Sequence, residues 1–460
     1  MIEFYLQHNR KNIRPLVSNL TDELEFFFDL EAIKVQHSDK VFFPVLKSEV
    51  SAKLFDKVNS FYETIEINKS RYPFLNNYVN KKDILIPEKF SFVDLFSGCG
   101  GLSLGLVNSG FQPVFINEID PSFAETFYFN HNLHSSQFYV GDINKLIDEI
   151  DTYSTFFKDT TLVCGGPPCQ GFSMANRQRL IDDPRNVLYK SYLKFLHQVR
   201  PDFFIMENVK GMSYKISEII SDFKKYMGSD YNFDYAILNA KDFGVPQNRE
   251  RFFLIGNRKG INTRKIFEQI KKECQTSFVL DDAISNLPEL KPKNIKNNNK
   301  INNLEYGATV RKISLEVNEY DDFLNDGKDS DYLFNHKNRY NNDRDIEIFS
   351  RLPQGANSLH SSISDIMPYS RRNHIFKDKY FKLKGSEVCK TITSHMKFDC
   401  NMYIHPRQPR GLSPREAARI QTFPDSYFFR GSQNKWYAQI GNAVPVKLAE
   451  VIGKSIMKFL

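Results

Sequence analysis

The sequence predicts an α/β protein with a doubly wound, mostly parallel sheet, a smaller irregular second domain and an N-terminal extension. From Phe90 onward, short apolar segments alternate with segments of helical pattern, which is typical of parallel strands joined by helices. The alternation stops after residue 258, where basic and asparagine-rich sequence begins. The chain has 460 residues, 41% hydrophobic and 25% charged, and is therefore long enough for two or three globular domains.

The N-terminal extension covers residues 1–88 and carries no recognisable chemistry. Val50, Leu54, Val58 and Phe61 recur at helical spacing and predict one amphipathic helix. We expect a small packing or docking domain here.

The first domain is expected at residues 89–258, completed by residues 433–460. Its predicted strands are Phe92–Phe96, Val114–Asn117, Phe138–Val140, Thr161–Cys164, Phe203–Met206 and Phe252–Ile255. Its predicted helices include Asn186–Val199 and Ser217–Met227, and a helical pattern returns at Val446–Leu460. In such a sheet, ligands bind at the carboxyl ends of the strands.

The second domain, with its hinge, is expected at residues 259–432. It begins with a basic stretch that ends in the low-complexity run Pro292–Asn303, which indicates a linker or exposed loop. The sequence that follows is rich in turns and dotted with basic and aromatic residues, such as Tyr369–His374.

Composition excludes several classes of protein. No apolar run approaches the roughly 18–20 residues of a membrane span, and the first residues lack the layout of a signal peptide. The six cysteines form no Cys-x-x-Cys pair, so we expect a reducing, cytoplasmic location. His131 and His134 are the only closely spaced histidines, and we predict no metal site. The net charge of +7 permits nucleic-acid binding without requiring it.

A thiol stands in a tight loop after one predicted strand. Thr161–Cys164 leads into the run Gly165-Gly166-Pro167-Pro168-Cys169-Gln170-Gly171-Phe172-Ser173. The prolines fix the backbone before Cys169, and the glycines allow a close approach to a ligand. Cys169 therefore fits a nucleophile, and the alternative is a small buried hydrophobe.

A glycine-rich turn and two acids indicate a nucleoside pocket. The first predicted strand runs into the turn within Asp94–Gly105, which brings a ligand close to a helix N-terminus. Ser103 replaces the third glycine of the dinucleotide fingerprint, so a nicotinamide enzyme fits imperfectly. Glu118, at the end of the next strand, could bind ribose hydroxyls, and Asp142 could accept from an adenine amino group. The alternative for each acid alone is a solvated strand-end residue.

A further acid and two arginines could serve the thiol. Glu207 follows the strand Phe203–Met206, where partial desolvation would raise its pKa towards the range of a proton donor. Arg249 and Arg251 lie two positions apart on extended chain and would point the same way, supplying positive charge to the thiol or to a base edge. The alternatives are a helix-capping glutamate and surface salt bridges.

In chain order, six blocks resemble the DNA (cytosine-5) methyltransferase family of bacterial restriction–modification systems. The blocks are Asp94–Gly105, Gly166–Ser173, Met206–Val209, Gly244–Arg251, Arg415–Pro424 and Gln439–Pro445. The resemblance implies a Rossmann-like, S-adenosylmethionine-dependent methyltransferase fold for the first domain and a target-recognition domain in residues 259–432. It also implies S-adenosyl-L-methionine as cofactor.

The resemblance further implies roles for individual residues. Cys169 would attack carbon 6 of cytosine, Glu207 would protonate ring nitrogen 3, and Arg249 with Arg251 would anchor the base. The residues implied in cofactor binding are Phe96, Ser97, Gly98, Gly100, Gly101, Glu118, Ile119, Asp142, Ile143, Pro168, Leu188, Asn442 and Val444. The residues implied in DNA contact are Gln170, Ser173, Arg371, Arg372, Thr391 and Thr393. Ile119 departs from the family pattern, because many relatives carry a bulky aromatic residue there.

The implied partner is double-stranded DNA, from which the target base must be flipped out to meet a thiol. We also expect a functionally paired restriction endonuclease, a monomer and no membrane contact. One alternative is the same chemistry on transfer RNA, which the long recognition region and the intact Gln170–Ser173 disfavour. Another is a non-catalytic DNA-recognition subunit, which the presence of Cys169, Glu207 and both arginines disfavours. A nicotinamide oxidoreductase is the more distant alternative.

Overall fold

The computed structural model describes most of the chain from Phe90 to Leu460. The described residues are 90–131, 133, 137–168, 188–275, 277–296, 302–328, 332–368 and 379–460. The predicted N-terminal extension and the predicted site residues Cys169, Gln170, Ser173, Arg371 and Arg372 lie outside them. Among the helices of the described residues, none is long and apolar enough to cross a membrane.

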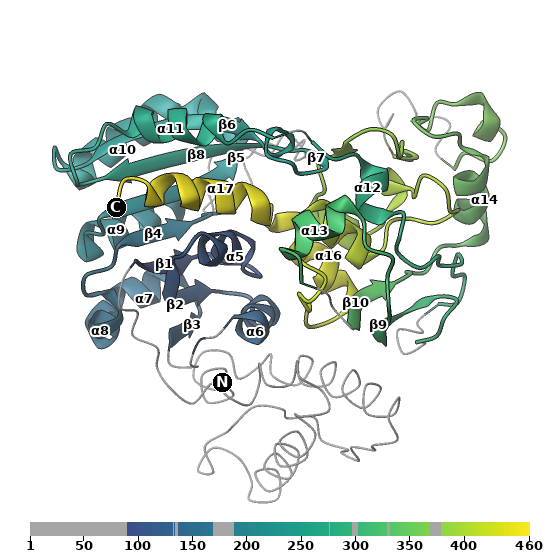
Figure 1. Ribbon diagram of the computed structural model, residues 1–460, viewed down its shortest axis with the longest axis horizontal. Coiled ribbons are helices and arrows are strands. Elements are labelled where there is room, and N and C mark those ends of the chain that lie inside the picture. The colour runs from purple at the N-terminus through teal and green to yellow at the C-terminus, as the bar shows by residue number, and fades with distance from the viewer. Residues whose placement is uncertain are drawn as a thin grey trace, which may run out of the picture.

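A seven-stranded sheet forms the centre of the first unit (Figure 1), with strands in the order β3-β2-β1-β4-β5-β8-β6. The strands are β1 (Ser91–Leu95), β2 (Gln112–Glu118), β3 (Phe138–Val140), β4 (Leu162–Gly165), β5 (Phe203–Val209), β6 (Asn232–Asn239) and β8 (Glu250–Asn257). β8 runs antiparallel to β5 and β6, and the remaining neighbours are parallel. The predicted mostly parallel sheet is confirmed, and each of the six predicted strands corresponds to an observed one.

Helices cover both faces of this sheet, which confirms the doubly wound fold. In β5, Phe203 and Ile205 face one side, whereas Phe204 and Met206 face the other, as the pleat requires. The first face packs against α5 (Gly101–Asn108), α11 (Thr263–Lys272) and α17 (Val446–Met457). The second packs against α7 (Ile143–Asp148), α8 (Ser154–Phe157), α9 (Leu188–Val199) and α10 (Ile216–Met227). α6 (Pro121–Asn130) contacts β2 and β3.

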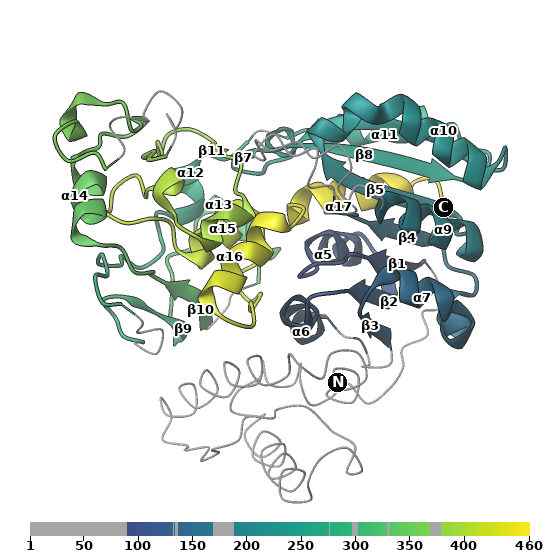
Figure 2. The same cartoon turned by 180° about the vertical axis from the view of Figure 1, so that it is seen from behind.

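The second unit lies beside the sheet and consists of short helices and two-stranded ladders (Figure 2). Its helices are α12 (Leu280–Ile284), α13 (Glu319–Asn325), α14 (Asp343–Arg351), α15 (Pro414–Ile420) and α16 (Gln433–Asn442). β9 (Gly307–Lys312) pairs with β10 (Tyr332–Lys337), and β11 (Cys389–Lys390) pairs with β7 (Gln247–Asn248). Because β7 directly precedes β8, the second ladder connects this unit to the sheet.

The domain boundaries at 258 and 432 stay predictions, and two helices that follow them pack against elements on the other side of each boundary. α11 follows residue 258, yet Ile266, Phe267 and Ile270 pack on the sheet. α16 follows residue 432, yet it packs against α15 in the core of the second unit. The basic residues of α11 add to the charge of this stretch, which favoured a linker or exposed loop, so the apolar side of the helix was not recognised in the sequence.

Candidate active site

The candidate residues gather where the parallel strands end. β1, β2 and β3 carry the glycine-rich turn, Glu118 and Asp142, whereas β4 and β5 carry the Pro-Pro segment and Glu207. Because these strands run in one direction, their carboxyl ends form one edge of the sheet, where ligands bind in open α/β folds.

The turn after β1, residues Ser97–Gly101, is named here the cofactor loop, and Glu118 fixes its backbone. One carboxylate oxygen of Glu118 accepts from the amide of Gly98 at 2.7 Å, and the other accepts from the amide of Asp120 at 2.8 Å. The amide of Ser97 donates to the carbonyl of Asn117 at 3.1 Å. Burial raises the pKa of Glu118 to about 7, against the lowering effect of these two amides. Hydroxyl donors from a ribose would favour its charged form.

The cofactor loop has the features that a nucleoside cofactor needs. Ser97 Oγ is buried and has no hydrogen-bond partner within the described part of the protein, and such atoms call for an explanation in a native fold. Gly98 adopts φ +59°, and a Cβ added there would meet nothing within 4 Å, so its outer side is open. Ile119, 63% exposed, extends beside Glu118. These residues fit a ligand with donor groups and an apolar face.

Other predicted pocket residues have structural partners of their own. Asp142 is the N-cap of α7 and accepts from the amide of Asn144 at 2.9 Å, and the next residue, Ile143, is buried. Phe96 has a left-handed backbone (φ 57°) and packs partly buried under the sheet. Leu188 begins α9 and also packs partly buried there.

Two glycines of the cofactor loop make close packing possible. A Cβ on Gly101 would lie 2.6 Å from the carbonyl of Val444, and a Cβ on Gly100 would lie 2.7 Å from His131 Nε2. Val444 is buried, whereas Asn442, the last residue of α16, is exposed. The loop therefore packs closely against the connection between α16 and α17.

Glu207 and Arg251 form a largely buried ion pair. Arg251 Nε lies 3.1 Å from Glu207 Oε1, and the two side chains are 13% and 12% exposed. Burial raises the pKa of Glu207, and the charges of Arg251 and Arg249 oppose the increase. A Cβ on Gly166 would lie 3.1 Å from Glu207 Oε2, so the loop after β4 passes directly over the carboxylate.

Asn208 holds the same loop from the adjacent position. Its side-chain amide, 5% exposed, donates to the carbonyl of Pro167 at 2.8 Å. Pro168 is exposed and is the last described residue before Cys169.

Arg249 and Arg251 have different partners. The Arg249 guanidinium donates to the carbonyls of Ile392, Gly441 and Ala443, at 2.6, 3.1 and 2.8 Å. Arg249 therefore joins the start of β8 to two segments near the end of the described chain. Sequence reasoning included Arg249 for its charge and had no means of identifying these carbonyls.

Thr391 and Thr393 follow β11 at the junction of the two units. Thr391 Oγ1 donates to the carbonyl of Asn248 at 2.7 Å, and Thr393 Oγ1 lies 3.0 Å from the hydroxyl of Tyr403. Thr391 therefore extends the contact between β11 and β7.

Comparison with known proteins relates this geometry to a family. The family model for C-5 cytosine-specific DNA methylases matches residues 90–458. The type II methyltransferase M1.HphI of Haemophilus parahaemolyticus is 33% identical over 375 residues, which cover 80% of this chain and 87% of that protein. The type II methyltransferase M.XorII of Xanthomonas oryzae pv. oryzae is 31% identical over 384 residues, covering 80% and 84%. An E. coli prophage protein, described in its crystal structure as a DNA modification methyltransferase, matches with a TM-score of 0.63 at 27% identity, covering 80% of this chain and 99% of that one.

Proposed function

The chain belongs to the C-5 cytosine-specific DNA methylase family, and on that basis we propose how this DNA (cytosine-5) methyltransferase acts. It transfers a methyl group from S-adenosyl-L-methionine to carbon 5 of a cytosine flipped out of double-stranded DNA. It acts as a monomer and as the modification enzyme that accompanies a restriction endonuclease, in keeping with relatives that are type II methyltransferases. The observation that carries the proposal is the buried Glu207–Arg251 pair directly beneath the loop that leads to Cys169.

The two proposed catalytic groups act at different atoms of the cytosine ring, one as a nucleophile and the other as a proton donor. The thiolate of Cys169 forms a bond to carbon 6, and Glu207 gives a proton to ring nitrogen 3, so negative charge does not accumulate on the base. Carbon 5 then becomes nucleophilic. After carbon 5 is methylated, loss of its proton restores the double bond between carbons 5 and 6 and releases the thiolate. Ring nitrogen 3 then returns its proton to Glu207, which restores the enzyme.

The raised pKa of Glu207 supports its role, because it keeps more of the carboxyl protonated near neutral pH than an exposed glutamate would be. Arg251 orients the carboxyl through the 3.1 Å contact. Arg249, which binds three backbone carbonyls, acts on the base by holding the surrounding segments in place.

When bound, S-adenosyl-L-methionine supplies an electrophilic methyl group. Glu118 would accept from its ribose hydroxyls, and the Ser97 hydroxyl, which has no partner among the residues that the structure describes, would gain one. Asp142 and Ile143 would contact the adenine, with the exposed Ile119 in the place of an aromatic side chain. Gly98 would leave the space that the cofactor requires.

DNA would bind at the junction of the two units. Flipping a base costs about a few kcal/mol, which phosphate contacts can offset. Thr391 and Thr393 lie at this junction, and Gln170, Ser173, Arg371 and Arg372 are further proposed contacts.

The test uses duplex DNA in which 5-fluorocytosine replaces cytosine. Fluorine at carbon 5 cannot leave as a proton, so release of the enzyme stalls. We expect a denaturation-resistant protein–DNA adduct that requires S-adenosyl-L-methionine and is absent in Cys169→Ser. Sequencing the trapped DNA identifies the target. An adduct on transfer RNA alone, or on neither nucleic acid, would contradict the proposal.

A further inference from the structure

Tyr427 belongs to the second unit but contacts the cofactor loop. It lies between α15 and α16, is 2% exposed and packs with Phe423 and Phe429 in the core of the second unit. Its hydroxyl donates a hydrogen bond to the carbonyl of Cys99, in the middle of the cofactor loop. A side chain of the second unit thus holds the backbone that is proposed to bind the cofactor.

The same hydroxyl also contacts the end of α6. The tyrosine hydroxyl has a single hydrogen, which it donates to the carbonyl of Cys99. Its oxygen therefore accepts from Nε2 of His131 at 3.2 Å. His131 is the C-cap of α6 and stacks on Phe127, with ring centroids 4.1 Å apart. Three segments distant in sequence therefore meet at one oxygen atom.

The inner side of the cofactor loop has no free space at this point. Gly100 has φ +93°, and a Cβ there would lie 2.7 Å from His131 Nε2 and 2.9 Å from the Tyr427 hydroxyl. At Gly98, by contrast, an added Cβ would meet nothing within 4 Å. The loop is thus held closely at Gly100 and has space at Gly98, as preorganised binding requires.

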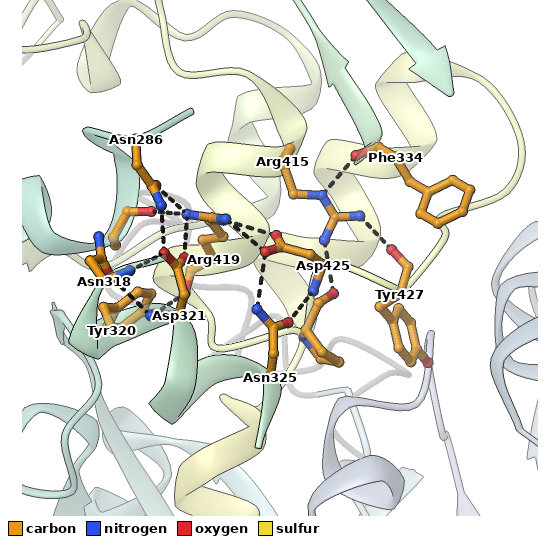
Figure 3. Close-up of polar contacts among 12 residues, drawn as sticks. Asn286, Asn318, Tyr320, Asp321, Asn325, Phe334, Arg415, Arg419, Asp425 and Tyr427 are labelled. Carbon is orange, nitrogen blue, oxygen red and sulfur yellow. Dashed lines mark hydrogen bonds and ion pairs between the residues drawn. The ribbon is translucent and has the colours of Figure 1, made fainter. Parts of the chain in front are cut away.

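Tyr427 is itself held by a buried arginine (Figure 3). Arg415, 0% exposed, donates to the carbonyl of Tyr427 and to the carbonyls of Phe334 and Pro424 at 2.7 and 3.0 Å. Arg415 belongs to α15 and Phe334 to β10, so the position of Tyr427 depends on the second unit.

We propose that Tyr427 is a positioning residue for cofactor binding, through which the second unit fixes the cofactor loop. The inference rests on the proposed function of that loop. It goes further, because it makes cofactor affinity depend on a side chain that supports the cofactor loop and is not itself proposed to contact the cofactor. By reciprocity, cofactor binding stabilises the segment around Tyr427.

The experiment compares Tyr427→Phe with Tyr437→Phe in the full chain. Tyr437 is buried in the same core and donates to the carbonyl of Leu412 at 2.7 Å, away from the cofactor loop, so the chemical change is matched. We expect Tyr427→Phe to raise the calorimetric dissociation constant for S-adenosyl-L-methionine about tenfold, since a buried carbonyl loses its donor. Tyr437→Phe should leave it within a factor of two, although both variants lower the melting temperature.

A dissociation constant that is equal in the two variants would overturn the inference. A wild-type protein that binds no S-adenosyl-L-methionine would instead overturn the proposed function. A second measurement uses hydrogen–deuterium exchange of the wild-type chain and needs no variant. Added cofactor should slow exchange at residues 423–429 as well as in the cofactor loop, and protection of the loop alone would contradict the coupling.

Discussion

Glu207 is subject to two opposing influences at the end of β5. Burial raises its pKa and is the larger influence, whereas the charges of Arg251 and Arg249 lower it. A carboxyl without the arginines would stay neutral over a wide pH range and lack a fixed orientation, and an exposed one would lose its proton well below neutral pH. Arg251 therefore holds the carboxyl of Glu207 in place, while burial keeps the pKa of this carboxyl above its ordinary value.

Glu207→Gln tests this residue as the proton donor. Glutamine keeps the shape and can accept from Arg251, but its amide is no acid. We expect methyl transfer to fall by about 10²–10⁴-fold, with an unchanged dissociation constant for S-adenosyl-L-methionine. The control is Glu250→Gln, an exposed carboxylate beside Arg251 that pairs with Lys210. Retention of most of the wild-type rate in Glu207→Gln would exclude the role.

The sequence could indicate the acidic residues of the site but not the buried side chains that hold its loops in place. Glu118 and Glu207 are predicted because parallel strands end at one edge, and the structure places them there. Arg251 is predicted from its spacing with Arg249 on extended chain, and the antiparallel pairing of β8 with β5 places it beside Glu207. Asn208 and Tyr427 were missed, since their partners lie 41 and 328 positions away in the chain. Tertiary packing decides which carbonyl a buried side chain contacts, and the local sequence pattern does not indicate it.

Helix α15 carries three buried charged residues, Arg415, Glu416 and Arg419. Arg419 forms two hydrogen bonds to Asp425, at 2.8 and 2.6 Å, and also contacts Asp321 at 3.1 Å (Figure 3). Arg410 forms a similar double contact with Glu416, which also closes the capping box with Ser413. Such pairs fix one arrangement, because loss of either partner leaves an uncompensated buried charge.

Asp425→Asn should therefore destabilise the second unit. We expect a loss of about 3 kcal/mol in the free energy of unfolding, measured in urea through the fluorescence of Trp436. This is the single tryptophan of the chain, and it lies in the same core. The matched control is Glu268→Gln, which breaks the exposed pair with Arg264 on α11 and should cost at most about 0.5 kcal/mol. Equal effects would show that the buried network contributes little.

At the scale of elements, apolar strands were predictable and two partly polar segments were not. β6 was missed because only Leu238 is fully buried and Asn232, Asp234 and Asn239 interrupt the apolar pattern. α11 was missed because its lysines and arginines outnumber the apolar residues that contact the sheet. Both segments are buried on one side only. Each therefore has too few apolar positions for its strand or helix pattern to be recognised in the sequence.

Buried carboxyls make the stability of the whole molecule depend on pH. Burial raises the pKa values of Asp94, Glu118 and Glu125 to about 7, whereas the unfolded values are about 4. Between these values the folded protein binds more protons than the unfolded chain, so their contribution falls as pH rises from about 4 to about 7. Below pH 4 it is fully present.

Asp94→Asn should weaken this dependence. Asparagine can still accept from the Ser103 hydroxyl, which lies 2.5 Å from the carboxylate, but it does not ionise. We expect the decline in stability between pH 5 and pH 7 to become shallower, by up to about 1 kcal/mol per pH unit. Melting temperatures across this range measure it, with the exposed Asp148→Asn as control. Parallel curves for wild type and Asp94→Asn would contradict the assignment.

The contact between α5 and α17 has a consequence for synthesis on the ribosome. Gly105 lies so close to α17 that an added Cβ would be 2.4 Å from Ala449 Cβ, and Leu102 and Leu106 share an apolar core with Leu448 and Ile452. At typical rates of translation, α17 is made on the order of half a minute after α5. During that interval the side of α5 that packs on α17 lacks this cover, and its apolar residues stay exposed to solvent or to transient contacts. The methyltransferase therefore cannot complete the helical layer on this face of its sheet until Val446–Met457 has emerged.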